Sequence, residues 1–338
     1  MNEVIVVKNK ERTPLYDVAK GICIISVVLG HLGIATRFVY FYHLPVFFFI
    51  SGLFLNAEKY SFKDFLLKKI KSLYVPYVII SLLFAIIFDF QNMKNIKYVL
   101  RIFLFDSKAP FTGTFWFIPC LLINSTIAFI TEKLTVKFDR KVRHGIYFGL
   151  FCFYVLMTFI FYKLDVHLYY NLHLIPWLQI IYILAFLFKY FHLQNILENK
   201  KVSIIIGISG FILLLLATLF TKLRIDIVQN QFMNSFLWIV FNFIGICFVF
   251  GVSSLIQKLN LFSLIGKHSF YIMCFHFVTF AFINVILSEF KDFDLGWGNG
   301  ISSLLVYILY GVGGVFVPLG LSVLVSFLKR RIKLICKN

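Results

Sequence analysis

The chain has 338 residues, of which 60% are hydrophobic and 14% charged, and its mean hydropathy is +0.89. Soluble globular domains usually carry about a quarter charged residues. This composition excludes a soluble globular protein and predicts an all-α, polytopic integral membrane protein. The 44 Phe and 17 Tyr residues suit a surface that faces lipid tails and headgroups.

Ten apolar segments are expected, each near the roughly 20 residues that a helix needs to span a bilayer. In chain order they cover about residues 18–36, 40–56, 74–90, 114–132, 145–162, 171–190, 202–221, 235–256, 268–288 and 300–328. The second and third are short, and the last is long enough to tilt. We expect one membrane domain over residues 15–330, a cytoplasmic N-terminal tail over 1–14 and a basic cytoplasmic C-terminal tail over 331–338.

The net charge of +18 is concentrated in alternate connecting segments. If the N-terminus is cytoplasmic, 24 of the 33 Lys and Arg residues lie inside, whereas the 15 acidic residues divide almost evenly. The positive-inside rule then places both termini in the cytoplasm. Because the excess charge follows membrane topology, it gives no support for a nucleic-acid partner, and the bilayer is the expected surroundings.

Three connecting segments have patterns of their own. Residues 57–73 place Phe and Leu against Lys at helical spacing, which predicts an amphipathic helix on the cytoplasmic leaflet, for lipid anchoring or for ligand binding. Residues 91–113 are polar at both ends and predict a short interfacial or re-entrant element over a cavity. The tyrosines of 163–173 are typical interface anchors, with sugar binding as the alternative.

The six cysteines form no CxxC pair and read as small core residues rather than a disulfide or zinc framework. No metal-spaced histidine cluster, serine hydrolase elbow or phosphate-binding glycine loop is present in the sequence. We therefore expect no metal. The remaining candidates for chemistry are histidines inside apolar segments.

The first apolar segment, DVAKGICIISVVLGH, carries Asp17, Lys20 and His31. A helix turns about 100° and rises about 1.5 Å per residue, so Lys20 and His31 share one face roughly 16 Å apart. Asp17, one turn before Lys20, can pair with it. The stripe would suit a long anionic ligand with phosphates at Lys20 and a reactive end near His31. Snorkelling to headgroups is the alternative for Lys20, whereas an ionisable residue as deep as His31 marks function and is a candidate general base.

Other polar residues occur in FYHLPVFFFISGLFL, GTFWFIPC and GKHSFYIMCFHF. His43 begins the second segment close to His31, and Ser51 lies further along it, where it can also serve close helix packing. Trp116 lies near the start of the fourth segment. His276 is deeper than His268 and is the better candidate of the two. These residues indicate a membrane cavity in which histidines carry the function. Group transfer and transport both remain open.

The two stretches DVAKGICIISVVLGH and FYHLPVFFFISGLF closely resemble the first two helices of acyltransferase family 3 membrane proteins, in the branch called fucose 4-O-acetylase-like. The likeness continues in order through LKKIKSLYVPY, FWFIPCLL and LIGKHSFYIMCFHF. It covers most of the first 125 residues and a patch near 264–277, and the middle of the chain matches only in hydropathy.

The resemblance implies a multi-pass enzyme of the bacterial cytoplasmic (inner) membrane. Such an O-acyltransferase moves an acyl group, expected to be acetyl from acetyl-CoA, to a sugar hydroxyl of a cell-surface polysaccharide or its precursor, here with His31 as the catalytic residue. Lys20 stands where the wider family commonly has arginine, and lysine binds phosphate as a point charge without bidentate geometry. Asp17, His43, Ser51, Trp116 and His276 complete the expected binding residues.

Two other classes of function remain open at this point. A transporter of polysaccharide or lipid-linked sugar is the alternative, which inverted repeats and paired helix breaks would favour, and neither is clear in the sequence. A structural or regulatory membrane protein is disfavoured by the histidines within the apolar segments.

Overall fold

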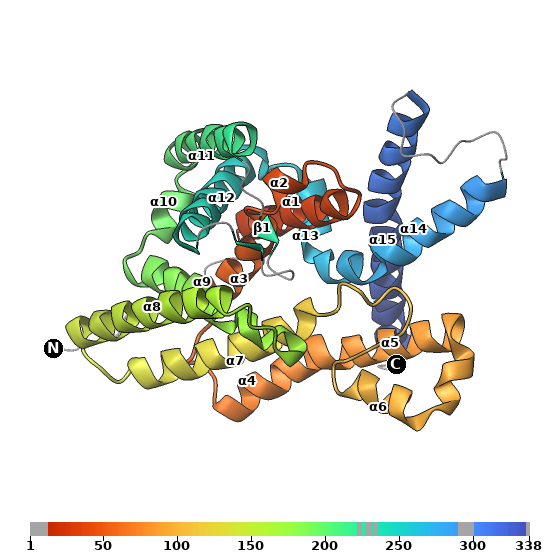
Figure 1. Cartoon of the computed structure of the whole chain (residues 1–338), viewed down its shortest axis with the longest axis horizontal. Helices are drawn as coiled ribbons and strands as arrows, with labels where there is room; N and C mark the ends of the chain where they lie inside the picture. The colour runs from red at the N-terminus through yellow and green to blue at the C-terminus, as the bar shows by residue number, and fades with distance from the viewer. Residues whose placement is uncertain (1–12, 222–224, 227–230, 233–234, 290–300, 336–338) are drawn as a thin grey trace.

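The computed structural model describes residues 13–221, 225–226, 231–232, 235–289 and 301–335, which are almost entirely helical (Figure 1). The all-α prediction is confirmed. The two strands among these residues, β1 (Ile225–Asp226) and β2 (Gln231–Phe232), form a short antiparallel pair. Residues 1–12, most of the predicted N-terminal tail, lie outside the described residues.

Nine helical stretches of the described chain are long and apolar enough to cross a membrane, which confirms a polytopic membrane protein. They comprise α1 (Pro14–His31), α4 to α5 (Phe62–Phe88), α7 (Phe117–Thr135), α8 (Arg140–Lys163), η3 to α9 (Tyr169–Tyr190), α11 (Lys200–Phe220), α12 (Ser235–Ile256), α14 (Ser269–Glu289) and α15 (Ile301–Ile335).

The predicted span over 40–56 is much shorter than expected. Its helix, α3 (His43–Leu53), has 11 residues and rises only about 16 Å, against a hydrocarbon core of about 30 Å. Protein rather than lipid surrounds it, since its Val46, Phe48 and Phe49 are fully buried. Irregular backbone at both ends is therefore tolerated.

The chain nevertheless passes from one face of the bundle to the other through α3. It enters α3 from α2 (Thr36–Val39), which follows the His31 end of α1. Beyond α3, the Leu55 carbonyl accepts a 3.0 Å hydrogen bond from Lys189, near the end of α9. The Ala57 carbonyl likewise accepts a 2.7 Å bond from Lys133, near the end of α7. Together with the nine longer stretches of the described chain, α3 gives an even number of passes, as the prediction of both termini on one side requires.

The predicted amphipathic helix over 57–73 is not a separate element. Ser61 caps α4 (Phe62–Lys69) by accepting from the Asp64 amide, and α4 continues through the π-turn η1 (Ile70–Tyr74) into α5 (Val75–Phe88). Pro76 in the first turn of α5 has no N–H to donate, which explains the irregular turn before it. The basic segment is thus the end of a membrane-length helix.

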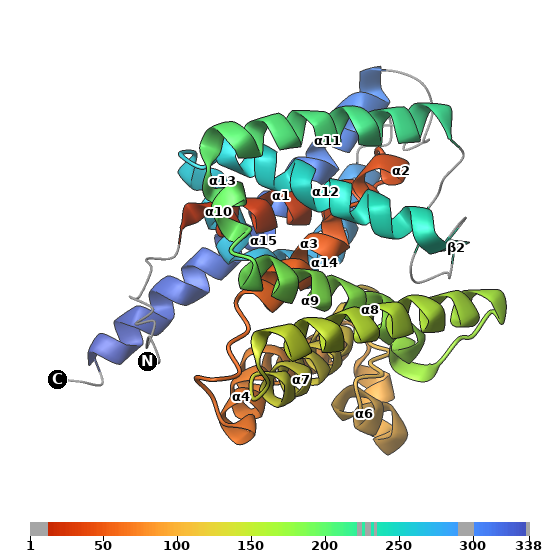
Figure 2. The ribbon, with the colours of Figure 1, turned by 90° about the vertical axis from the view of Figure 1, so that its left-hand side faces the viewer.

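The helix α1 lies between two groups of helices (Figures 1 and 2). On one side α11 packs on α12, and on the other α14 packs on α15. The short α13 (Asn260–Lys267) lies directly against α1, because Gly266 lets the two backbones touch: a Cβ at Gly266 would be 1.7 Å from the Asp17 carbonyl oxygen. The helices α7, α8 and α9 form a further layer below α3 and α12 in Figure 2.

The segment over 91–113 contains none of the membrane-length helices, in line with an interfacial element. It contains the end of η2 (Phe90–Lys94), α6 (Ile96–Phe103) and an irregular loop, and the Tyr74 hydroxyl donates to the Phe103 carbonyl at 2.9 Å. One further short helix, α10 (Gln194–Glu198), joins α9 to α11.

At the C-terminal end, α15 continues to Ile335, past the expected domain boundary at residue 330. The first part of the expected basic tail is therefore a continuation of the last membrane helix.

Candidate functional site

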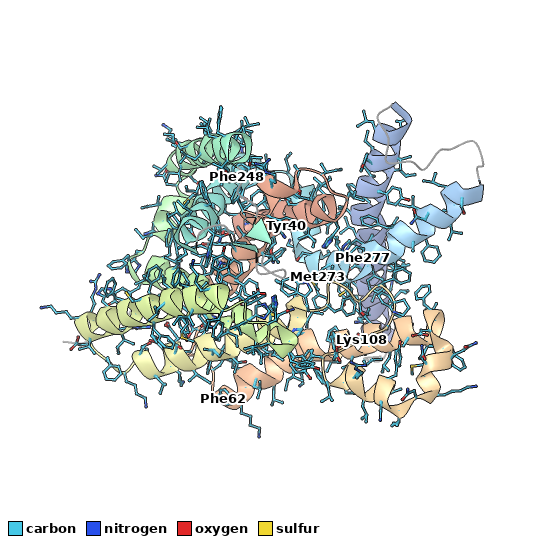
Figure 3. All side chains as sticks on the ribbon, in the orientation of Figure 1. Tyr40, Phe62, Lys108, Phe248, Met273 and Phe277 are labelled. Carbon is cyan, nitrogen blue, oxygen red and sulfur yellow. The ribbon has the colours of Figure 1, made fainter. Side chains whose placement is uncertain are left out.

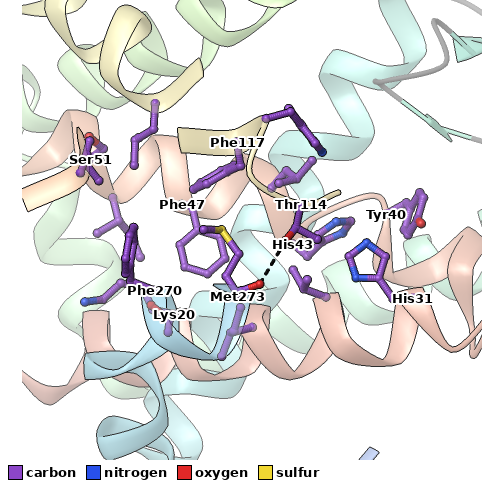
Figure 4. A pocket seen from close by; sticks show the side chains of 18 residues that line it. Lys20, His31, Tyr40, His43, Phe47, Ser51, Thr114, Phe117, Phe270 and Met273 are labelled. Carbon is purple, nitrogen blue, oxygen red and sulfur yellow. Dashed lines mark hydrogen bonds between the residues drawn. The ribbon is translucent and has the colours of Figure 1, made fainter. Parts of the chain in front are cut away.

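One cavity of about 450 Å³ lies between α1, α3, α14 and the residues that lead into α7 (Figure 4). Its lining is mostly apolar, and the polar or ionisable side chains in it are Lys20, His31, Tyr40, His43, Ser51, Thr114, Trp116 and Ser269. Lys20 lies toward one end and His31 toward the other (Figure 4). An apolar cavity with a few polar groups is the usual form of a small-molecule site.

The face of α1 that lines this cavity follows helical spacing. Lys20, Ile24, Val27 and His31 are spaced by four, three and four residues and all contribute to the lining. The structure therefore places Lys20 and His31 on one stripe, as the sequence predicts, and joins them by a continuous space.

Lys20 is held at its end of the cavity by Asp17. Its Nζ lies 2.7 Å from Asp17 Oδ1, and the side chains are 18% and 2% exposed. Asp17 does not line the cavity. Its place is behind Lys20, where it can orient the ammonium group.

At the other end, His31 is paired with His276 from α14. His31 Nδ1 lies 2.9 Å from His276 Nε2, and the rings are almost parallel with centroids 5.0 Å apart. His276 is fully buried and does not line the cavity, whereas His31 does and is exposed. His276 therefore lies behind His31, outside the cavity lining, and it also contacts the Ile272 carbonyl and the rings of Phe277 and Phe280.

The hydrogen bonds of the pair determine the tautomer of both neutral rings. His276 Nδ1 lies 3.0 Å from the Ile272 carbonyl, which only accepts, so this nitrogen carries the proton. His276 Nε2 then has a lone pair and accepts from His31 Nδ1–H. The remaining nitrogen of His31, Nε2, is left unprotonated and able to act as a base.

His43 lines the same cavity from the start of α3. Its Nδ1 donates to the Val39 carbonyl at 2.7 Å, which leaves Nε2 as an acceptor by the same reasoning. The Tyr40 ring packs beside it at 5.0 Å between centroids. A hydroxyl that enters between His31 and His43 meets two acceptors.

The cavity is also lined by residues from α3 and from the loop that leads into α7. Ser51 lines it and accepts a 3.0 Å hydrogen bond from the Tyr182 hydroxyl, while its neighbour Gly52 packs closely on Ala185. Trp116 also lines it. Thr114, which sequence reasoning did not select, donates to the Met273 carbonyl at 3.1 Å and joins the loop before α7 to α14 (Figure 4).

His268, the weaker candidate, lies away from the cavity lining and hydrogen-bonds Ser322 on α15 at 2.6 Å. In the described part of the chain, no three His, Cys, Asp or Glu side chains gather as metal ligands would. The five cysteines there are free thiols, and Cys336 lies outside it.

Comparison with known proteins identifies the family. A family model described as an acyltransferase domain matches residues 15–325, nearly the whole chain. Searches of curated proteins and of solved structures gave no match. The matched region contains every residue of the cavity described above. The chain therefore belongs to acyltransferase family 3, and it is a multi-pass membrane acyltransferase.

Proposed function

We propose that the protein is an O-acetyltransferase that moves the acetyl group of acetyl-CoA to a sugar hydroxyl of a cell-surface polysaccharide or its precursor, in a bacterial cytoplasmic membrane. The observation that carries the proposal is the single cavity that joins Lys20 to the His31–His276 pair. One end of that cavity suits an anion, and the other end presents a base.

The donor fits this space with its charged part at Lys20. The expected cytoplasmic face bears Lys20, and an ammonium group binds phosphate as a point charge. The apolar walls around Ile24, Val27 and Phe47 suit the uncharged arm that carries the acetyl thioester. The nucleotide would remain at the cytoplasmic mouth, so that the thioester extends toward His31.

In the proposed step, His31 Nε2 accepts the proton of the sugar hydroxyl as the hydroxyl oxygen attacks the thioester carbonyl carbon. A new C–O bond forms, the C–S bond breaks, and the proton passes from His31 to the departing thiolate. The result is an acetyl ester and free CoA. His276 accepts from His31 Nδ1–H throughout and so stabilises the positive charge that develops on the His31 ring.

A test uses the purified full-length protein in lipid nanodiscs with acetyl-CoA and the unacetylated polysaccharide from a strain that lacks the gene. Wild type should release CoA thiol and add acetyl groups to the glycan. His31→Ala should lower both rates by at least about 100-fold, the scale of a lost general base. His268→Ala is the matched control and should remain active, because His268 lies outside the cavity. Normal acetylation by folded His31→Ala would contradict the proposal.

A further inference from the structure

A second cavity, of about 530 Å³, lies beside the first on the side of the molecule where α1 ends at His31. It is enclosed by the loop over 105–116, which follows α6, and by η3 (Tyr169–Leu174). Lys108 marks this loop in Figure 3. The charge pattern predicts that both segments lie outside the membrane. The fold brings them together although about 60 residues separate them.

The lining of this second cavity combines aromatic rings with hydrogen-bonding groups. Tyr77, Trp116, Tyr169 and Tyr170 provide rings, and Asp106, Ser107, Lys108, Thr112 and Asn171 provide donors and acceptors. A pyranose ring has C–H groups on its faces and hydroxyls around its edge. Flat aromatic surfaces match the faces, and amide, hydroxyl and carboxylate groups match the edge.

Asp106 is fixed as a charged acceptor in this lining. Its two oxygens lie 2.8 Å from Arg101 Nε and 2.9 Å from Lys108 Nζ. A carboxylate has about four lone-pair sites, so it can still accept from a hydroxyl. Of these three residues only Asp106 and Lys108 line the cavity. Their charges balance, which suits a sugar better than it suits a phosphate.

The backbone around the cavity is held in an unusual conformation. Phe105, Phe111, Tyr170 and Asn171 all have φ between 55° and 64°, the left-handed region that bulky residues rarely adopt. The Tyr77 hydroxyl accepts from the Ser107 amide at 3.1 Å and fixes one of the two loops. Such conformations persist where the surroundings impose them, and they gather at binding sites. The cavity is thus a preformed shape.

Trp116 lines both cavities. A glycan that rests in the second cavity therefore has a neighbouring unit beside the first one, where His31 is. We propose that the second cavity is the acceptor subsite, which binds a pyranose unit adjacent to the unit that is acetylated. This inference rests on the proposed function.

The subsite predicts that acceptor binding and donor chemistry can be separated by mutation. Tyr169 is 82% exposed, so Tyr169→Ala should fold normally, and Asn171→Ala removes a hydrogen-bonding group. Each should weaken binding of the unacetylated polysaccharide by about tenfold or more, the effect of losing roughly 1.4 kcal/mol. Hydrolysis of acetyl-CoA without glycan should stay within about twofold of wild type, because that reaction uses the first cavity.

The experiment measures glycan binding by saturation-transfer NMR or fluorescence with full-length protein in nanodiscs. Phe90→Ala is the matched control, since Phe90 is an exposed aromatic residue in an outer segment but does not line the cavity. Wild-type binding by both folded Tyr169→Ala and Asn171→Ala would overturn the subsite. Failure of wild type to transfer acetyl would overturn the proposed function, while the binding comparison would still decide the subsite.

Discussion

His31 Nδ1 lies 2.9 Å from His276 Nε2, although 245 residues separate them in the chain. The Ile272 carbonyl fixes the His276 tautomer, and His276 in turn fixes that of His31. The role of His276 is therefore to position a base, since it touches His31 and not the cavity. This arrangement makes a prediction that distinguishes hydrogen bonding from packing.

His276→Leu should lower kcat roughly 10- to 100-fold, as loss of a supporting hydrogen bond does at other sites, and should leave KM for acetyl-CoA nearly unchanged. His276→Gln should retain most activity, because its amide oxygen accepts from His31 and its amide nitrogen donates to Ile272. Steady-state kinetics on both variants measure this. Equal losses in Leu and Gln variants of the same abundance would show that His276 acts only by filling space.

Lys20 should contribute to donor binding through the donor's phosphates. We expect Lys20→Ala to raise KM for acetyl-CoA about tenfold, or about 1.4 kcal/mol, and Lys20→Arg to stay near wild type because arginine also binds phosphate. Lys63→Ala, on the exposed part of α4, is the control for general surface charge.

A donor without phosphates makes this comparison sharper. With acetyl-pantetheine as donor, wild type and Lys20→Ala should have similar KM values. If the variant is equally impaired with both donors, Lys20 does not bind phosphate, and its effect comes from the loss of its pair with Asp17.

The features of this site that were predictable from sequence each depend on a single helix. The shared face of Lys20 and His31 follows from the helical repeat alone, and the depth of His276 follows from hydropathy. Contacts between distant segments were not predictable. Glu132, for example, is buried against Arg143 at 2.9 Å and Lys189 at 3.4 Å, and nothing in the three local sequences indicates that these charges meet.

In the fold, too, local features were predictable and contacts between distant segments were not. Ten apolar segments and their order were predicted because hydropathy is local. Each contains a helix in the described residues, and nine of these helical stretches are long enough to cross a membrane. The short length of α3 and the continuity of α4 with α5 were not predicted, because both depend on what surrounds each segment. Hydropathy cannot distinguish a helix enclosed by protein from one that faces lipid.

The loop over 105–116, which carries Asp106, should lose stability as the pH falls. Partial burial alone would raise the pKa of Asp106, but Lys108 and Arg101 outweigh it and hold that pKa below its ordinary value. A carboxyl with a lowered folded-state pKa stabilises the fold above its unfolded pKa of about 3.9, and this contribution disappears as the pH falls through the folded value. The pairs are partly exposed, so the contribution is at most about 1 kcal/mol.

Asp106→Asn should therefore lower the unfolding temperature at pH 7 by at most about 2 °C, and the difference from wild type should shrink below about pH 4. Thermal unfolding in nanodiscs at several pH values measures this difference. Asp165→Asn is the control, since Asp165 is 81% exposed and pairs with His167. A difference that stays constant with pH would contradict the assignment to Asp106.

The contact between α1 and α13 should tolerate no side chain at residue 266. A Cβ there would be 1.7 Å from the Asp17 carbonyl oxygen, so Gly266→Ala must push apart the backbone that carries Asp17 and Lys20. We expect Gly266→Ala to lower the free energy of unfolding by about 1–3 kcal/mol, as at other overpacked sites. The KM for acetyl-CoA should rise as well. Gly145→Ala in α8 is the matched control, because a Cβ there meets nothing within 4 Å. Alanine is the better helix former by roughly 0.5–1 kcal/mol, so the control should be neutral or slightly stabilised in thermal unfolding. A Gly266→Ala protein as stable as Gly145→Ala would show that α13 does not lie so close to α1.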